Sequence, residues 1–127
     1  MLVNIAAIFI AGGFGALARF GLSSYLTSIF GKGAPWGTAL VNLLGCLCFG
    51  ALAALFSAKT TWSPQLQTIV LTGFFGAFTT FSTYIFELNA LLNDGAYGRA
   101  CADFLLQNVG GLGAVLLGAA LLKRFIL

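Results

Sequence analysis

The sequence predicts an all-α integral membrane protein with four transmembrane helices. Hydrophobic residues make up 60% of the 127 residues and charged residues only 7%, whereas about a quarter of the residues in ordinary globular domains are charged. The runs without a formal charge cover residues 2–18, 33–58, 60–86 and 104–122. A helix needs roughly 20 apolar residues to cross a hydrocarbon core about 30 Å thick. Each run therefore matches about one crossing, and we expect residues 1–127 to form a single transmembrane domain.

The composition also argues against several other classes of protein. The first apolar run has no basic segment before it and no small-residue cleavage site, so we do not expect a cleaved signal peptide. The apolar runs are continuous and lack the alternation of a membrane β-barrel. Histidine is absent, and the only acidic residues are Glu87, Asp94 and Asp103. Acid–base and metal catalysis would lack most of their usual groups, so we do not expect an enzyme.

Turn signals divide the chain into four predicted helices. The expected helices cover approximately residues 2–30, 36–58, 64–93 and 98–124. The third helix has a clear start, because Ser63 can act as its N-cap and Pro64 suits the first helical position. The sequence Asn93-Asp94-Gly95 is typical of a turn and ends this helix.

Basic residues are divided evenly between the two predicted membrane faces. One face carries Lys59, Lys123 and Arg124, and the other carries Lys32 and Arg99, with Arg19 deeper in the first helix. Because the numbers are equal, the positive-inside rule predicts no strong preference for either membrane orientation. Two oppositely oriented copies could then form a dimer with a two-fold axis in the membrane plane. The alternative is that one weakly preferred orientation prevails.

The third helix contains the densest group of polar residues within an apolar run. Gly73 and Gly76 precede four hydroxyl residues in the five positions 79–83. This pattern predicts a helix break in the middle of the membrane. Backbone unwound at that depth must be buried in protein or line a cavity, and its carbonyls can coordinate a cation. Beyond the break, a predicted polar stripe comprises Thr80, Thr83 and Glu87.

Asn42 is a polar residue near the middle of the second helix, and Thr38 lies one turn before it on the same face. An amide offers two N–H donors without a charge. It can therefore contact an anion without trapping it. The alternative role is an interhelical hydrogen bond.

Two further features each allow two interpretations. Phe74, Phe78, Phe81 and Ile85 recur at helical spacing and could pack against other helices, or their electropositive ring edges could line the path of a small anion. Arg19 could extend to the membrane interface. Alternatively, it could lie at the foot of a water-filled vestibule and attract anions there.

Taken together, these residues resemble the CrcB/Fluc fluoride-channel family. The resemblance covers essentially the whole chain. It rests on Gly12-Gly13 through Ala18-Arg19, Gly37-Thr38 through Val41-Asn42-Leu43, Gly73, Gly76, Thr79-Thr80-Phe81-Ser82-Thr83 and Glu87. It implies a passive, fluoride-selective channel in the bacterial inner (plasma) membrane. Such a channel lets cytoplasmic fluoride leave the cell and so lowers fluoride toxicity.

The resemblance also implies an assembly and a set of site residues. Two subunits in antiparallel orientation would form a homodimer with two pores, and a structural Na⁺ at their interface would be held by the backbone carbonyls of Gly76 and Thr79. Phe81 and Tyr84 match the two positions of a phenylalanine box. The other implied pathway residues are Asn42, the vestibule residue Arg19, and Thr80, Thr83 and Glu87 along a polar track. The expected partners are fluoride, the lipid bilayer and a second copy of the chain, with no nucleic acid.

The chain departs from this family at several positions. Tyr84 stands where phenylalanine is expected, and Gly111 stands where the fourth helix usually carries a serine. Gln107 and Asn108 lie close enough in sequence to Gly111 to compensate for the missing hydroxyl.

Two other functions are compatible with a short four-helix membrane protein. A drug–proton antiporter needs an ionisable carboxylate within the membrane, but the first helix has none. A non-conducting assembly subunit would need packing glycines, but it would need neither a central amide nor a polar stripe beyond a helix break.

Overall fold

The computed structural model of the chain describes residues 2–31, 36–58 and 62–126. Within this part of the chain, the helices long and apolar enough to cross a membrane are Asn4–Phe30, Trp36–Ala58, Pro64–Asn93 and Tyr97–Phe125. The prediction of four membrane-spanning helices is therefore confirmed, and the chain is a multi-pass membrane protein. Residues 32–35 and 59–61, which belong to the connections expected between the first three helices, lie outside the described residues, and Lys32 and Lys59 are among them.

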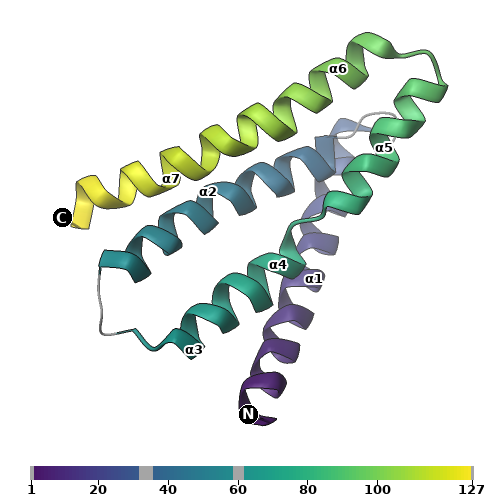
Figure 1. The fold of residues 1–127 in the computed structure, drawn as a ribbon. Helices are drawn as coiled ribbons and strands as arrows, with labels where there is room; N and C mark the ends of the chain where they lie inside the picture. The colour runs from purple at the N-terminus through teal and green to yellow at the C-terminus, as the bar shows by residue number, and fades with distance from the viewer. Residues whose placement is uncertain (1, 32–35, 59–61, 127) are drawn as a thin grey trace.

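The first two spans are uninterrupted helices, whereas the third is visibly broken before α5 (Figure 1). The fourth is a continuous coil in which a π-helical segment separates two α-helical ones. The first two are α1 (Leu2–Phe30) and α2 (Trp36–Ala58). The third comprises α3 (Pro64–Gln67), the π-helical segment η1 (Thr68–Phe75), α4 (Gly76–Phe78) and α5 (Phe81–Asn93). The fourth comprises α6 (Tyr97–Leu105), the π-helical segment η2 (Leu106–Gly110) and α7 (Gly111–Ile126).

Local sequence signals explain where the third span begins and ends. Ser63 is the N-cap of α3, where its hydroxyl accepts a hydrogen bond from the Leu66 N–H at 3.2 Å, and Pro64 occupies the first helical position. At the other end, Gly95 has a φ of +69°, a left-handed conformation that glycine adopts without steric cost. This conformation turns the chain from α5 towards α6.

Close backbone contacts determine which helices lie side by side. In Figure 1, α7 runs alongside α2, and α1 crosses behind the first half of the third span. A side chain at Gly118 would collide with the Leu47 carbonyl, and one at Gly15 would collide with the Phe74 carbonyl. Small residues permit such close helix packing in lipid, where little hydrophobic force draws helices together.

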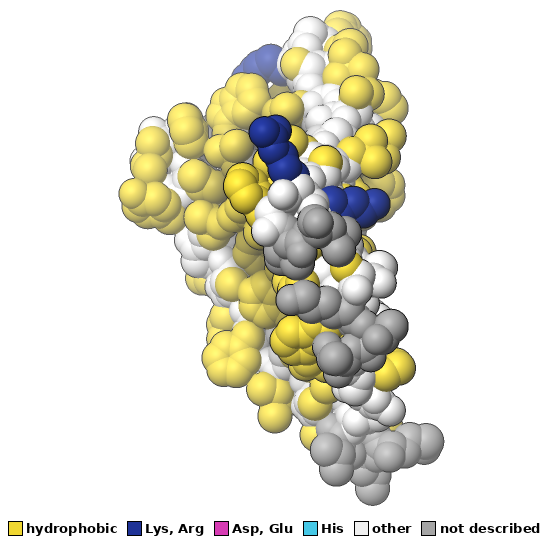
Figure 2. Space-filling view, turned by 90° about the vertical axis from the view of Figure 1, so that its left-hand side faces the viewer, with side chains coloured by type: hydrophobic (Ala, Val, Ile, Leu, Met, Phe, Trp, Pro, Cys, Tyr) yellow, Lys and Arg dark blue, Asp and Glu magenta, His cyan; other side chains and the backbone are white. Residues whose placement is uncertain are grey.

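The buried core is small and lies between α1, α2 and the first half of the third span. Val41 is fully buried, and Phe75 and Phe78 pack with it. Most other large apolar side chains point outward, and the face shown in Figure 2 is largely hydrophobic with isolated Lys and Arg side chains. This surface suits contact with lipid tails or another apolar subunit, because neither requires polar groups.

Candidate functional site

The third span is broken between α4 and α5, as predicted, at Thr79 and Thr80. Both residues are extended, with φ, ψ of −85°, 156° and −146°, 114° respectively. Gly73 and Gly76, which contributed to the prediction, lie in helical segments just before the break. The hydroxyl residues therefore mark the unwound position more accurately than the glycines do.

Asn42 holds the break to α2 by a two-point contact with the backbone of Thr80. The Thr80 N–H donates to Asn42 Oδ1 at 2.8 Å, and Asn42 Nδ2 donates to the Thr80 carbonyl at 3.1 Å. These bonds satisfy backbone groups that unwinding would otherwise leave without partners in an apolar setting. The interhelical hydrogen bond considered for Asn42 is thus present.

The break also frees carbonyl groups that a continuous helix would use. In an α-helix each N–H donates to the carbonyl four residues earlier. The Thr80 N–H donates to Asn42 instead, and the Thr83 N–H donates to Thr80 Oγ1 at 3.4 Å. The carbonyls of Gly76 and Thr79 consequently lose their helical donors.

Arg19 contacts the break from α1. Its Nε donates to the Ala77 carbonyl at 3.1 Å, and the residue is half-buried. This contact ties α1 to the break, and the vestibule role expected for Arg19 stays a prediction. The bond places a permanent positive charge near the carbonyl-rich C-terminal end of α4, where the helix dipole is negative.

Asn42 is also the first member of a chain of amides that leads to the fourth span. Its Nδ2 donates to Gln107 Oε1 at 2.7 Å, and Gln107 Nε2 donates to Asp103 Oδ1 at 2.9 Å. Asp103 is only 3% exposed, and its Oδ2 has no hydrogen-bond partner among the described residues. A buried carboxylate thus terminates a hydrogen-bond network that begins at the helix break.

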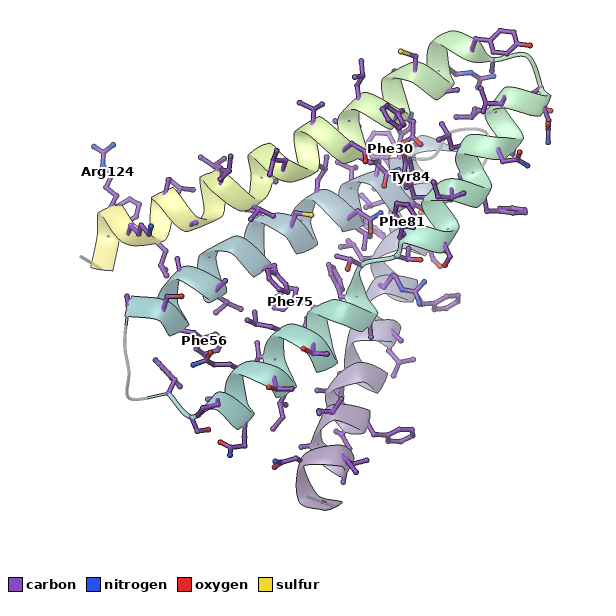
Figure 3. All side chains as sticks on the ribbon, in the orientation of Figure 1. Phe30, Phe56, Phe75, Phe81, Tyr84 and Arg124 are labelled. Atoms are coloured by element: carbon purple, nitrogen blue, oxygen red, sulfur yellow. The ribbon has the colours of Figure 1, made fainter. Side chains whose placement is uncertain are left out.

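The two aromatic residues at the start of α5 have different environments (Figure 3). Tyr84 is buried and its hydroxyl accepts a hydrogen bond from Asn108 Nδ2 at 2.8 Å, whereas Phe81 is 72% exposed. Their rings are 5.7 Å apart and meet edge to face. The break therefore separates Phe81 from Phe74 and Phe78, which pack together within the subunit.

Two cavities meet at Thr80. The first, here called the amide cavity, has a volume of 200 Å³ and is lined by Asn42, Cys46, Thr79, Thr80, Phe81, Tyr84, Gln107 and Asn108. The second, here called the arginine cavity, has a volume of 310 Å³ and is lined by Arg19, Phe20, Ser23, Ser24, Thr38, Val41, Thr80 and Thr83. The sequence-predicted pathway residues, apart from Glu87, line one or both of these cavities.

Glu87 lies beside the arginine cavity rather than in its lining. Its Oε1 accepts a hydrogen bond from the Thr38 hydroxyl at 2.7 Å, and its Oε2 is buried without a partner among the described residues. The Thr80 hydroxyl donates to the Thr83 hydroxyl at 3.0 Å. The predicted polar stripe therefore consists of two separate hydrogen-bonded pairs, Thr80 with Thr83, and Glu87 with Thr38 of α2.

The sequence points to Gln107 and Asn108 in the fourth span as a replacement for the missing hydroxyl, but it gives no role to Asp103. Asp103 and Gln107 stand one helical turn apart and so share a face. Gln107 and Asn108 both lie in η2. Such π-helical segments are rare and often occur at functional sites. For Asp103, its four-residue spacing from Gln107 is the available signal.

The chain is similar to one protein family and to several known proteins. Residues 6–119 match the model of the family described as "CrcB-like protein, Camphor Resistance (CrcB)". Relatives named "Fluoride-specific ion channel FluC" occur in Solidesulfovibrio magneticus (41% identity, covering 95% of this chain and 97% of the relative) and Nitrosococcus oceani (43%, covering 91% and 92%). Another relative of that name, from Chloroflexus aurantiacus, is 39% identical over 96% of this chain and 97% of its own length.

Proposed function

The chain belongs to the CrcB-like family, and from this membership we propose that it is a passive, fluoride-selective ion channel. It lets cytoplasmic fluoride leave the cell and thereby lowers fluoride toxicity. The nearly full-length similarity to relatives named as fluoride-specific ion channels is the observation that carries this proposal. We assign the protein to the bacterial inner membrane, and we propose conduction rather than catalysis as its activity.

The two cavities at the helix break supply suitable groups for an anion. Fluoride is small and strongly hydrated, so a conducting site must replace its water with other hydrogen-bond donors and yet release it. Threonine hydroxyls and amide N–H groups line the cavities, together with the Arg19 side chain. Arg19 raises the local anion concentration, and the neutral groups provide contacts without a fixed charge that would retain the ion.

The functional unit in this proposal is a homodimer of antiparallel subunits. Phe81 borders the amide cavity yet is 72% exposed, so one wall of that cavity lies at the surface of the single subunit. A second copy would cover this face and complete the wall. The ring edges of Phe81 and Tyr84 would then offer electropositive surface to the anion.

A structural Na⁺ between the subunits fits the residues at the break. Gly76 is exposed, and the carbonyls of Gly76 and Thr79 both lack their helical donors. Carbonyl oxygens are suitable ligands for such a cation. Two oxygens from each copy would hold it, and its charge would stabilise the carbonyl-rich ends of α4 brought together at the interface.

The alternatives have less support. The relatives are named as channels rather than exchangers, which disfavours a drug–proton antiporter. A non-conducting assembly subunit would not need the hydrogen-bonded break between two polar cavities.

Fluoride efflux from liposomes containing the purified protein tests the proposed function. With a potassium ionophore to balance charge, a fluoride electrode should record rapid release, while chloride-loaded liposomes should release little chloride. Protein-free liposomes provide the baseline. Fluoride release no faster than this baseline, from a protein that remains folded in detergent, would refute the proposal.

A further inference from the structure

Both donors of the Asn42 amide are engaged in the described structure. One N–H donates to the Thr80 carbonyl and the other to Gln107 Oε1. The contact with Thr80 is reinforced by the reciprocal bond from the Thr80 N–H. The single bond to Gln107 is therefore the contact that an incoming acceptor can replace at lower cost, because its replacement leaves the break intact.

The orientation of these amides is fixed from both ends. The Thr80 N–H can only donate, so the Asn42 side chain must turn its oxygen towards Thr80 and its nitrogen towards Gln107. At the other end, Asp103 Oδ1 accepts from Gln107 Nε2, so Gln107 must turn its oxygen towards Asn42. Asp103 thereby holds the Gln107 oxygen on the Asn42 donor.

We propose, on the basis of the proposed function, that Gln107 is a specificity-determining residue that competes with the permeating anion for Asn42. Asn42 and Gln107 both line the amide cavity. An anion there gains the second Asn42 N–H only by displacing the Gln107 oxygen. Asp103 is the positioning residue that keeps this internal competitor in place.

This exchange favours a compact anion. A hydrogen bond to a charged acceptor is stronger than one to a neutral amide oxygen. The gain increases as the charge approaches the donor, because Coulomb energy varies inversely with distance. The hydrogen bond from Asn42 to fluoride is therefore stronger than the bond to Gln107 that it replaces. The bond to a larger halide is weaker than the bond to fluoride. An anion that accepts hydrogen bonds only weakly does not displace the Gln107 oxygen from Asn42.

The test compares Gln107→Leu, Asp103→Leu and the double variant in the liposome assay, with Gln65→Leu as the matched control. Gln65 is exposed in α3 and lies outside both cavities. Gln107→Leu should lower the half-saturating fluoride concentration roughly two- to tenfold, the range expected for one hydrogen bond. It should also raise chloride flux relative to fluoride flux. Asp103→Leu should act in the same direction, and Gln65→Leu should match the wild type.

The double variant tests whether Asp103 acts through Gln107. It should behave like Gln107→Leu alone, because the second change removes a partner that is already absent. Asp103→Asn should restore wild-type selectivity, since it keeps an oxygen acceptor. Additive effects in the double variant, or an unchanged chloride-to-fluoride ratio in Gln107→Leu, would overturn the proposal.

A second measurement separates this proposal from the proposed function. In protein labelled with ¹⁵N-asparagine, the Asn42 side-chain resonance can be assigned by its absence in Asn42→Ala. It should shift in both Gln107→Leu and Asp103→Leu, whether or not the protein conducts fluoride. An unshifted resonance would overturn the hydrogen-bonded chain, whereas a wild-type protein without fluoride flux would refute the function.

Discussion

Asn42 connects three parts of the molecule through one side chain. Its oxygen accepts from the backbone of Thr80, and its nitrogen donates both to Thr80 and to Gln107 on the fourth span. The same residue therefore stabilises the helix break and lines the amide cavity. A structural role and a role in conduction are consequently not exclusive at this position.

Substitutions of the two rings at the start of α5 should differ in severity. Phe81→Ile keeps an apolar side chain but removes the aromatic ring edge, so fluoride flux should fall strongly while the dimer persists. Tyr84→Phe should be mild, because it removes one hydrogen bond worth about 0.5–1.5 kcal/mol and leaves Asn108 bonded to the Phe104 carbonyl. Asn42→Ala should reduce flux more than Tyr84→Phe, since three hydrogen bonds disappear.

The measurement is fluoride-electrode efflux from liposomes for each variant, with gel filtration to verify the dimer. Full flux through a well-folded Phe81→Ile protein would show that this ring serves only packing.

At the scale of the element, the close pairing of α2 and α7 depends on glycines. A Cβ added at Gly118 would collide with the Leu47 carbonyl, whereas one added at Gly113 would meet no described residue within 4 Å. Both residues lie in α7. They therefore form a matched pair for separating helix packing from helix propensity.

Gly118→Ala should destabilise the protein by about 1–3 kcal/mol, because the added methyl group overpacks a backbone contact. Gly113→Ala should be neutral or stabilising by up to about 1 kcal/mol, since alanine favours helix more than glycine does. Thermal unfolding in detergent measures both changes. Equal effects from the two variants would contradict the packing assigned to Gly118.

The spans could be predicted from the sequence because their cause is local. Uncharged runs of membrane length specify helices almost independently of tertiary contacts, and Ser63 and Pro64 mark a helix start through neighbouring residues alone. The broken third span was also predictable in outline. The hydroxyl residues place the break within 79–83, but the partner that holds the unwound backbone at Thr80 is Asn42, which lies in another helix and is not indicated by the local sequence.

The polar network of the fourth span was harder to predict for the same reason. Asp103 and Gln107 could be paired by their spacing, but their connection to Asn42 requires the packing of the fourth span against α2. Asn108 likewise contacts Tyr84 on α5. These contacts join residues far apart in sequence, and hydrophobic periodicity carries no information about them.

At the scale of the whole molecule, the single subunit leaves its site incomplete. Phe81 is exposed beside the amide cavity, and Gly76 presents its backbone at the surface. A second subunit is the proposed cover for both. The orientation of this second subunit and the binding of a cation at the interface can each be tested separately.

Sodium binding should depend on backbone geometry at the break rather than on side chains. Thr79→Ala keeps the carbonyl and should still bind Na⁺. Gly76→Leu should impair association while leaving the subunit folded, because among the described residues a Cβ added there would meet only the Leu71 carbonyl, at 3.9 Å. Sodium titration and light scattering of the purified variants measure these effects. A dimer that binds no cation would exclude the sodium site.

Both membrane orientations should occur in cells. The basic residues are divided equally between the two predicted faces, so the positive-inside rule gives no strong preference. Reporter fusions at the C-terminus should therefore detect copies on each side of the membrane. A single orientation in nearly all molecules would contradict an antiparallel homodimer and would require a different partner chain.

The reversal potential of single dimers in a planar bilayer tests passive fluoride conduction most directly. With a tenfold fluoride gradient, the current should reverse at about 59 mV, the Nernst potential of a monovalent ion. This potential should not change when chloride replaces an inert anion or when a pH gradient is imposed. A reversal potential that follows chloride or protons instead would contradict a passive, fluoride-selective channel.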